Sequence, residues 1–211
     1  TERFGAASPA TVEVSSFKRL YYQTLNETGG AELKKLSVGG KTLLLNYLCL
    51  RSKKQLKVLG KTAGYRGFAS MMADFLRELK AYNVTPELLL ETAKKTGRQD
   101  KLTLKLEDLS LLYTAYTQTT SSRFSDADDE VGLLARMIRE NHSLYRDALF
   151  VLDGFSGFTP QEFSVISALM GCAEQVAVAF DCDTLDGNGT LFAMQRKNYR
   201  KLCAAAAEAG M

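Results

Sequence analysis

The stretch Leu149-Phe150-Val151-Leu152-Asp153-Gly154-Phe155-Ser156-Gly157-Phe158-Thr159-Pro160-Gln161-Glu162-Phe163 decides the fold of this 211-residue chain. Its first four residues form an apolar run of strand length, which Asp153-Gly154 ends. Thr159-Pro160 is a typical helix start, and a second apolar run follows at residues 175–180. Strand, helix and strand at this spacing predict a parallel βαβ unit. Because both runs are apolar throughout, we expect a sheet that is covered on both faces.

The rest of the chain is mostly helical in pattern. Residues 11–14 alternate and are rich in β-branched side chains, so a short strand is expected there. Apolar residues at helical spacing then predict helices at residues 17–25, 42–50, 68–82, 86–96, 102–119, 125–140 and 191–208. The fold class is therefore α/β, with an α/β beginning and end around a large helical middle.

Composition excludes several classes of protein. Hydrophobic residues make up 45% and charged residues 24% of the chain, which is typical of globular domains rather than disordered segments. No apolar run approaches the roughly 18–20 residues of a membrane helix, and the first ten residues lack the apolar core of a signal peptide. We therefore expect no membrane partner. Since the chain begins at Thr1 rather than Met, we expect it to be a segment of a longer protein.

Cysteine and histidine are too sparse and too scattered for familiar site chemistry. The four cysteines form no C-x-x-C pair, and His142 is the only histidine. A zinc or iron–sulfur site built from this chain alone is not expected, and neither is a Ser-His-Asp or Cys-His site. Free thiols are the expected state, and they indicate a reducing, cytoplasmic environment.

Positive charge is concentrated in one stretch. Residues 34–66 contain nine Lys or Arg residues and no acidic residue, which leaves 18 basic against 24 acidic residues elsewhere. Contact with the phosphates of DNA requires such a stretch, although solvated lysines on a helix face give the same pattern. The candidate DNA-binding residues are Lys41, Arg51, Lys53, Lys54, Lys57, Lys61 and Arg66.

Two short motifs imitate a phosphate-binding P-loop. Gly40-Lys41-Thr42 and Gly60-Lys61-Thr62 match the end of G-x-x-x-x-G-K-[ST], but the first glycine is replaced by Lys35 and Gln55 respectively. We therefore expect no nucleotide-cradling loop in this chain.

The apolar run ending in Asp153 matches the Walker B pattern, in which an aspartate after a buried strand helps to hold Mg²⁺ on nucleotide phosphates. An Asp-Gly turn after an ordinary strand would look the same. The segment 153–163 further resembles motif II of superfamily-1 helicases, where a strand ending in Asp-Glu is followed by a helix that opens with Pro and Gln. The strand ending at Phe180-Asp181 lies where that family places motif III.

The pattern Asp-Gly-Phe-x-x-Phe-Thr-Pro-Gln-Glu-Phe narrows the resemblance to the B subunit of AddAB-type (RexAB-type) ATP-dependent helicase–nucleases. The resemblance extends from about residue 11 to residue 210, and it includes residues 14–20 with Gly29-Gly30, residues 75–80 and residues 106–113. It implies a partial P-loop NTPase sheet, superfamily-1 helicase-like, made of residues 1–29 and 144–211. Residues 30–143 would then be an inserted all-helical subdomain that holds the basic stretch.

The resemblance also implies a role and partners. Such B subunits pair with an A subunit, bind broken DNA ends and process double-strand breaks for recombinational repair. ATP and Mg²⁺ belong to the parent protein, and its 4Fe–4S cluster lies elsewhere in the chain, so no cofactor or metal is expected in this segment. Asp153 and Gln161 are the candidate residues for a nucleotide and its Mg²⁺, although a glutamine at a helix start is more often solvated.

One departure from the motif bears on catalysis. The glutamate that activates water in active helicases is replaced by Gly154, so general-base assistance worth roughly 10²–10⁴-fold should be missing. We therefore expect no independent catalysis from this segment, and a role in DNA binding or scaffolding. Two alternatives stay open. One is an active helicase domain, joined to its upstream P-loop, in which Glu162 or another acid replaces the missing base. The other is a purely structural interaction domain.

Overall fold

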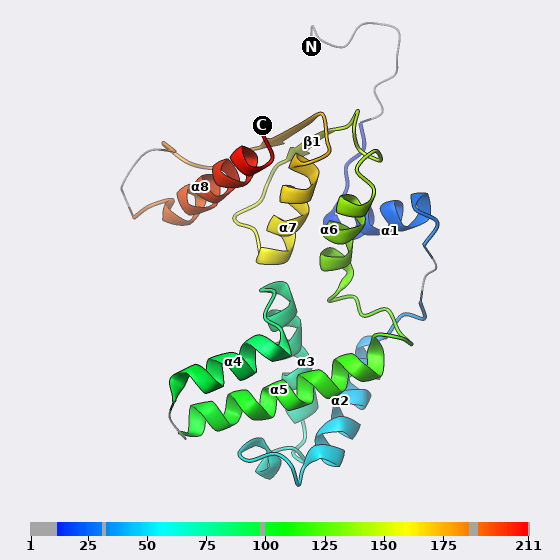
Figure 1. Ribbon diagram of the computed structural model, residues 1–211, viewed down its shortest axis with the longest axis vertical. Helices are drawn as coiled ribbons and strands as arrows, with labels where there is room; N and C mark the ends of the chain where they lie inside the picture. The colour runs from blue at the N-terminus through cyan, green and yellow to red at the C-terminus, as the bar shows by residue number, and fades with distance from the viewer. Residues whose placement is uncertain (1–11, 31–32, 98–99, 186–189, 211) are drawn as a thin grey trace, which may run out of the picture.

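The computed structural model describes residues 12–30, 33–97, 100–185 and 190–210. Within these residues the protein is mostly helical, with one small parallel sheet (Figure 1). The elements are α1 (Phe17–Glu27), α2 (Val38–Ser52), the 3₁₀ turn η1 (Leu59–Lys61), α3 (Phe68–Ala81), α4 (Pro86–Thr96), α5 (Lys101–Thr120), α6 (Glu130–Glu140), β1 (Leu149–Leu152), α7 (Pro160–Met170), β2 (Gln175–Val178) and α8 (Ala193–Glu208).

The predicted βαβ unit is confirmed. β1 and β2 pair in parallel, with Leu149 opposite Gln175 and Leu152 opposite Val178. α7 connects them, and it begins with the expected start: the Thr159 hydroxyl accepts from the Glu162 N–H while the Glu162 carboxylate accepts from the Thr159 N–H. This capping box satisfies two N–H groups that would otherwise have no partner at the helix start.

Among the described residues the sheet is covered on one face only, which differs from the prediction. Phe150 and Leu152 pack into hydrophobic clusters with residues of α7, and α1 and α8 contribute to the same clusters. Leu149 and Val151 point the other way, and Val151 is 66% exposed. Side chains alternate across a strand, so a run that is apolar at every position leaves one row bare when no second layer is present.

The predicted strand at residues 11–14 is wrong for the residues described. Thr11 lies outside the described residues, and residues 12–14 are not in a strand. Val12 and Val14 are both 88% exposed, so their β-branched side chains pack against nothing that would hold an extended segment in a sheet. The wider P-loop NTPase sheet therefore stays a prediction beyond the two strands seen.

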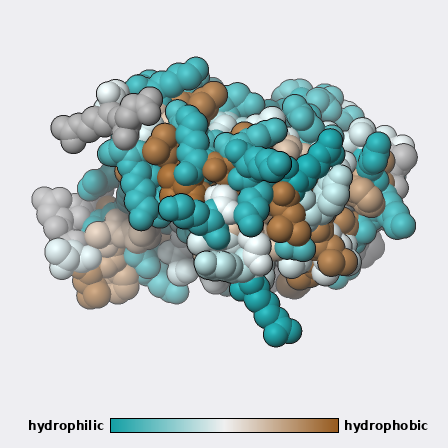
Figure 2. All heavy atoms as spheres, turned by 90° about the horizontal axis from the view of Figure 1, so that it is seen from below, coloured by the Kyte–Doolittle hydropathy of each residue, from teal (hydrophilic) through white to brown (hydrophobic). Residues whose placement is uncertain are grey.

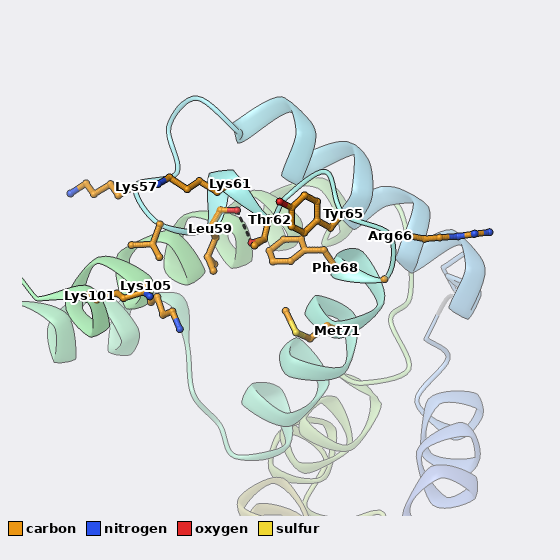
Figure 3. A pocket seen from close by; sticks show the side chains of 12 residues that line it. Lys57, Leu59, Lys61, Thr62, Tyr65, Arg66, Phe68, Met71, Lys101 and Lys105 are labelled. Atoms are coloured by element: carbon orange, nitrogen blue, oxygen red, sulfur yellow. Dashed lines mark hydrogen bonds between the residues drawn. The ribbon is translucent and has the colours of Figure 1, made fainter.

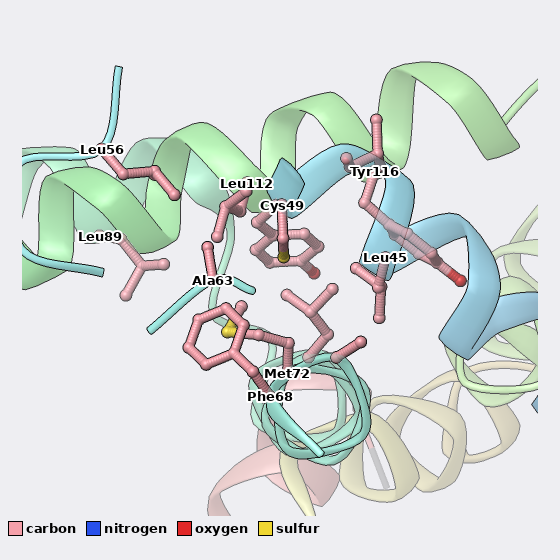
Figure 4. Close-up of a cluster of buried hydrophobic side chains, with 13 residues drawn as sticks. Leu45, Cys49, Leu56, Ala63, Phe68, Met72, Leu89, Leu112 and Tyr116 are labelled. Carbon is pink, nitrogen blue, oxygen red and sulfur yellow. The ribbon is translucent and has the colours of Figure 1, made fainter. Parts of the chain in front are cut away.

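α2, η1, α3, α4 and α5 form a separate helical body in the lower part of Figure 1. Its core holds fully buried side chains from three helices, including Leu45 of α2, Met72 of α3 and Tyr116 of α5 (Figure 4). The helix ends follow their sequence signals: the Thr85 hydroxyl caps α4, and Gly97 ends it with a left-handed φ of 60°.

α6 lies within the range predicted for the inserted helical subdomain, but it packs with the α/β part. Its Leu134, Ala135 and Ile138 share a core with Tyr21 of α1 and Leu169 of α7. Two connections link the helical body to the rest, and they run side by side, since the Leu36 N–H donates to the Ser125 carbonyl at 2.9 Å. By packing, α6 therefore goes with the α/β part, and the domain boundaries at residues 29 and 143 stay predictions.

Candidate nucleic-acid interface

An open pocket of about 930 Å³ lies on the helical body, between η1, the start of α3 and the start of α5 (Figure 3). Five basic residues line it, and none of the residues described as lining it is acidic. Its lining is Lys57, Val58, Leu59, Lys61, Thr62, Tyr65, Arg66, Gly67, Phe68, Met71, Lys101 and Lys105. We call this the basic pocket. Figure 2 shows the molecule from below, where hydrophilic side chains cover much of the surface around smaller hydrophobic patches.

A buried carboxylate fixes the segment that forms one wall of the basic pocket. Asp108 of α5 accepts from the backbone N–H groups of Lys57, Val58 and Leu59, each at 2.8 Å. Next to them, a side chain at Gly60 would bring its Cβ within 2.7 Å of the Lys53 carbonyl oxygen. The turn is thereby held against α5, so the lysines that follow it project from a rigid base.

The cations of the basic pocket are mostly unneutralised. Lys57 pairs with Glu107 at 2.5 Å. Within the described ranges no ion pair engages Lys61, Arg66, Lys101 or Lys105, and all four are exposed. Positive groups in a concave site reinforce one another's field, which attracts polyanions.

The basic stretch predicted from the sequence divides into two groups in the structure. Lys57, Lys61 and Arg66 line the basic pocket. Arg51, Lys53 and Lys54 are exposed at the end of α2 and in the turn after it. The charge pattern did not reveal Lys101, Lys105 and Tyr65, although the spacing of Lys101 and Lys105 by four residues placed them on one face of a helix.

Lys41 lies apart from this surface. It is buried in α2, where it pairs with Asp128 and lies 3.3 Å from an Asp126 carboxylate oxygen. Its charge is satisfied inside the protein, so we leave it out of the proposed DNA contact.

Lys41 belongs to a buried cluster of charges at the junction of the two bodies, which we call the charge hub. Its members are two cations, Lys41 and Lys80, three carboxylates, Asp126, Asp128 and Asp129, and the hydroxyl of Tyr116. Lys80, at the end of α3, lies 2.8 Å from Asp126 and 2.7 Å from Asp129. The hub thus joins α2, α3 and α5 to the segment that leads into α6.

The hub shifts the proton affinities of its members. Burial favours a neutral Asp126, but the charge and hydrogen bond of Lys80 outweigh burial and lower the pKa of Asp126 to about 2. Burial raises the pKa of Asp129, and Lys80 only partly opposes this. Burial opposes the charge of Lys80, but the carboxylates of Asp129 and Asp126 outweigh burial and raise its pKa.

The two Walker B candidates, Asp153 and Gln161, do not face one another in the structure. Asp153 is exposed directly after β1, and its carboxylate accepts from the Gly154 N–H at 2.9 Å. Gly154 has a left-handed φ of 76°, which glycine adopts without strain. Gln161 is buried and donates to the Asp128 carbonyl at 3.3 Å, so its side chain joins α7 to the hub segment instead of facing Asp153.

The fit to a nucleotide with Mg²⁺ is incomplete. Asp153 supplies the oxygen ligand that Mg²⁺ prefers, but the described residues offer no glycine-rich loop to hold the phosphates. In the same ranges no cluster of three potential metal ligands occurs.

Cys49 is buried, and burial raises the pKa of its thiol to about 11. No helix in the described part of the chain has the length and apolar character needed to cross a membrane.

Comparisons with known proteins place this arrangement in a family. The family model "ADDB, N-terminal" matches residues 2–211. Proteins named as the B subunit of an ATP-dependent helicase/deoxyribonuclease are 36% identical in Acetivibrio thermocellus, 36% in Desulforudis audaxviator and 37% in Moorella thermoacetica. Each match covers 98% of this chain but only 18%, 18% and 19% of the relative. The chain therefore belongs to the family of helicase–nuclease B subunits and corresponds to their N-terminal domain.

Proposed function

We propose that this domain contacts DNA through the basic pocket and the adjoining Arg51, Lys53 and Lys54, and that it does not hydrolyse ATP. In the whole protein it would take part in the repair of DNA double-strand breaks in the cytoplasm, with DNA and an A subunit as its partners. The observation that supports DNA contact best is the basic pocket itself, which gathers five cations from two separated segments and has no acidic residue in its described lining. When such a surface neutralises DNA phosphates, the counterions condensed on the DNA are released into solution, which favours binding independently of sequence.

DNA binding in varied salt tests the first half of this proposal. In the full-length protein, the double variant Lys61→Gln/Lys105→Gln should weaken binding to any sequence and reduce the slope of log K against log[salt] by up to about 2. Lys94→Gln/Lys95→Gln is the matched control, since it removes two exposed lysines of α4 outside the pocket. Equal binding by both double variants would refute the pocket's role.

Three features support the absence of ATP turnover in this domain. Gly154 offers no proton acceptor beside Asp153. Glu162, the alternative base, is engaged in the capping box with Thr159. Gln161 is buried against the Asp128 carbonyl. An ATPase assay on the full complex, with the A subunit silenced through mutation, tests this directly, and turnover at ordinary helicase rates would contradict it. The ATP, Mg²⁺ and 4Fe–4S cofactors of the parent protein stay predictions.

The structure also bears on the two alternatives. An active helicase domain would need Glu162 free to activate water, and the capping box holds both that carboxylate and its backbone N–H. A purely structural domain would leave the basic pocket without a ligand. Loss of all DNA affinity at low salt in a protein that still assembles with its partner would favour that structural role.

A further inference from the structure

We propose that the basic pocket takes an unpaired DNA strand and stacks one base on the ring of Tyr65. This inference rests on the proposed function, because it assumes that the pocket contacts DNA, and it adds which form of DNA enters and what holds the base. The grounds are the exposure of Tyr65, the apolar surface beside it and the lysines opposite (Figure 3).

Tyr65 is a large aromatic side chain that the fold leaves in the open. It is 69% exposed, and within the described residues its hydroxyl has no hydrogen-bond partner. Its backbone is nevertheless fixed on both sides: its N–H donates to the Thr62 carbonyl at 2.9 Å, and its carbonyl accepts from the Phe68 N–H at 3.1 Å. A ring on a rigid turn loses little conformational entropy when a flat ligand covers it.

The neighbouring surface suits a base better than a phosphate. Met71 is 56% exposed and lies on the same side of the pocket as Tyr65 and the buried Phe68 (Figure 3). Thr62, which also lines the pocket, already donates its hydroxyl to the Leu59 carbonyl at 3.1 Å. This side of the pocket is therefore largely apolar.

The opposite side suits the sugar–phosphate backbone. Lys101 and Lys105 project from α5, and Lys61 lies above them on η1 (Figure 3). Lys101 and Lys105 lie across the pocket from the aromatic side (Figure 3), so a nucleotide can place its base on Tyr65 and its phosphate near an ammonium group. A pocket of about 930 Å³ is near the upper end of the ~300–1,000 Å³ range of small-ligand pockets, which leaves room for a short stretch of strand.

The same arrangement discriminates against duplex DNA. In the interior of a duplex both faces of each base are covered by neighbouring bases, so Tyr65 cannot reach an interior base without unstacking it. Base–aromatic stacking is tolerant of sequence and strengthens binding by roughly 5- to 150-fold per base. The pocket should therefore prefer unpaired strands and show little preference among sequences.

A photo-crosslinking experiment on the full-length protein in its complex locates the base. The probe is a short oligo(dT) in which one thymine is replaced by 5-iodouracil, and the crosslinked peptide is identified by mass spectrometry. We expect the crosslink at Tyr65, its loss in Tyr65→Ala and its retention in Tyr65→Phe, which keeps the ring. Tyr82→Ala, which removes another exposed tyrosine of the helical body at the end of α3, is the matched control and should leave the crosslink unchanged.

Binding measurements separate this inference from the proposed function. Tyr65→Ala should weaken binding of the oligo(dT) about 5-fold or more, and it should change duplex binding less than about 2-fold. If Tyr65→Ala has no effect while Lys61→Gln/Lys105→Gln weakens both forms of DNA, the stacked base is wrong and the DNA contact stands. If neither variant changes any binding, both proposals are overturned, and a crosslink outside the pocket residues also overturns the stacked base.

Discussion

The ammonium group of Lys80 lies 2.8 Å from a carboxylate oxygen of Asp126, and the two side chains are only 5% and 4% exposed. A charge pair this deeply buried costs desolvation energy on both sides, so neither partner can be removed cheaply. Lys80 lies in the last turn of α3 and Asp126 precedes α6, so their contact fastens the helical body to the segment that enters the α/β part. The Tyr116 hydroxyl donates to the same Asp126 carboxylate at 2.7 Å.

Asp126→Asn should loosen the helical body. Removing one partner of a buried pair typically costs about 3–5 kcal/mol, and the low end is expected because Lys80 keeps Asp129. Hydrogen exchange in the full-length protein should show faster exchange of the α3 amides. Asp74→Asn, which breaks an exposed pair with Arg77 on the same helix, should leave that exchange rate unchanged. Unchanged protection in Asp126→Asn would show that the hub does not stabilise α3.

Acid should weaken the same contact. The pKa of Asp126 is lowered to about 2, so its stabilisation is complete above the ordinary aspartate pKa near 4 and is lost as pH falls through about 2. The full effect is about 2 kcal/mol. Burial raises the pKa of Asp129, which acts in the opposite direction and reduces the net change. Protection of the α3 amides should therefore fall below about pH 4 in the wild type, and this fall should be much smaller in Asp126→Asn.

Asp108→Ala should release the turn that forms one wall of the basic pocket. The substitution removes the acceptor for three backbone N–H groups, and hydrogen bonds to a charged acceptor are worth about 1.5–3 kcal/mol each. Trypsin should cut faster after Lys57 and Lys61, and DNA binding should weaken although no pocket cation is lost. Asp108→Asn keeps one acceptor oxygen and should give a smaller effect. Equal cleavage rates in Asp108→Ala and the wild type would contradict this role of Asp108.

Glu162→Ala should affect helix stability and leave ATP turnover unchanged. It removes one half of the capping box at the start of α7, which should cost about 1 kcal/mol. Thermal unfolding of the full-length protein measures this loss, and an ATPase assay on the complex measures turnover. A large drop in turnover would instead identify Glu162 as the missing base.

Much of the fold could be predicted from the sequence, because its signals are local. The βαβ unit follows from two apolar runs around a Thr-Pro helix start, and the end of α4 follows from Gly97. The strand expected at residues 11–14 failed because alternation describes a strand that has neighbours, whereas Val12 and Val14 have none among the described residues.

The candidate site could be predicted only in part, because it is assembled from distant segments. The basic stretch supplied Lys57, Lys61 and Arg66, but Lys101 and Lys105 lie some forty residues further on, and only the packing of α5 brings them to the same pocket. The burial of Lys41 could not be predicted either, because its carboxylate partners are 85 and 87 residues away in the sequence. Charge alone does not tell a solvated lysine from a paired one.

The exposed apolar side chains on one face of β1 affect how the isolated segment behaves in solution. Val151 is an exposed apolar side chain, and in the described part of the chain the outer edge of β1 pairs with no further strand, so β1 of one molecule can pack against β1 of another. This segment prepared alone should therefore self-associate: it should elute from a size-exclusion column before the volume of a monomer, and it should precipitate when concentrated. Replacing Val151 with lysine should restore a single monomeric peak.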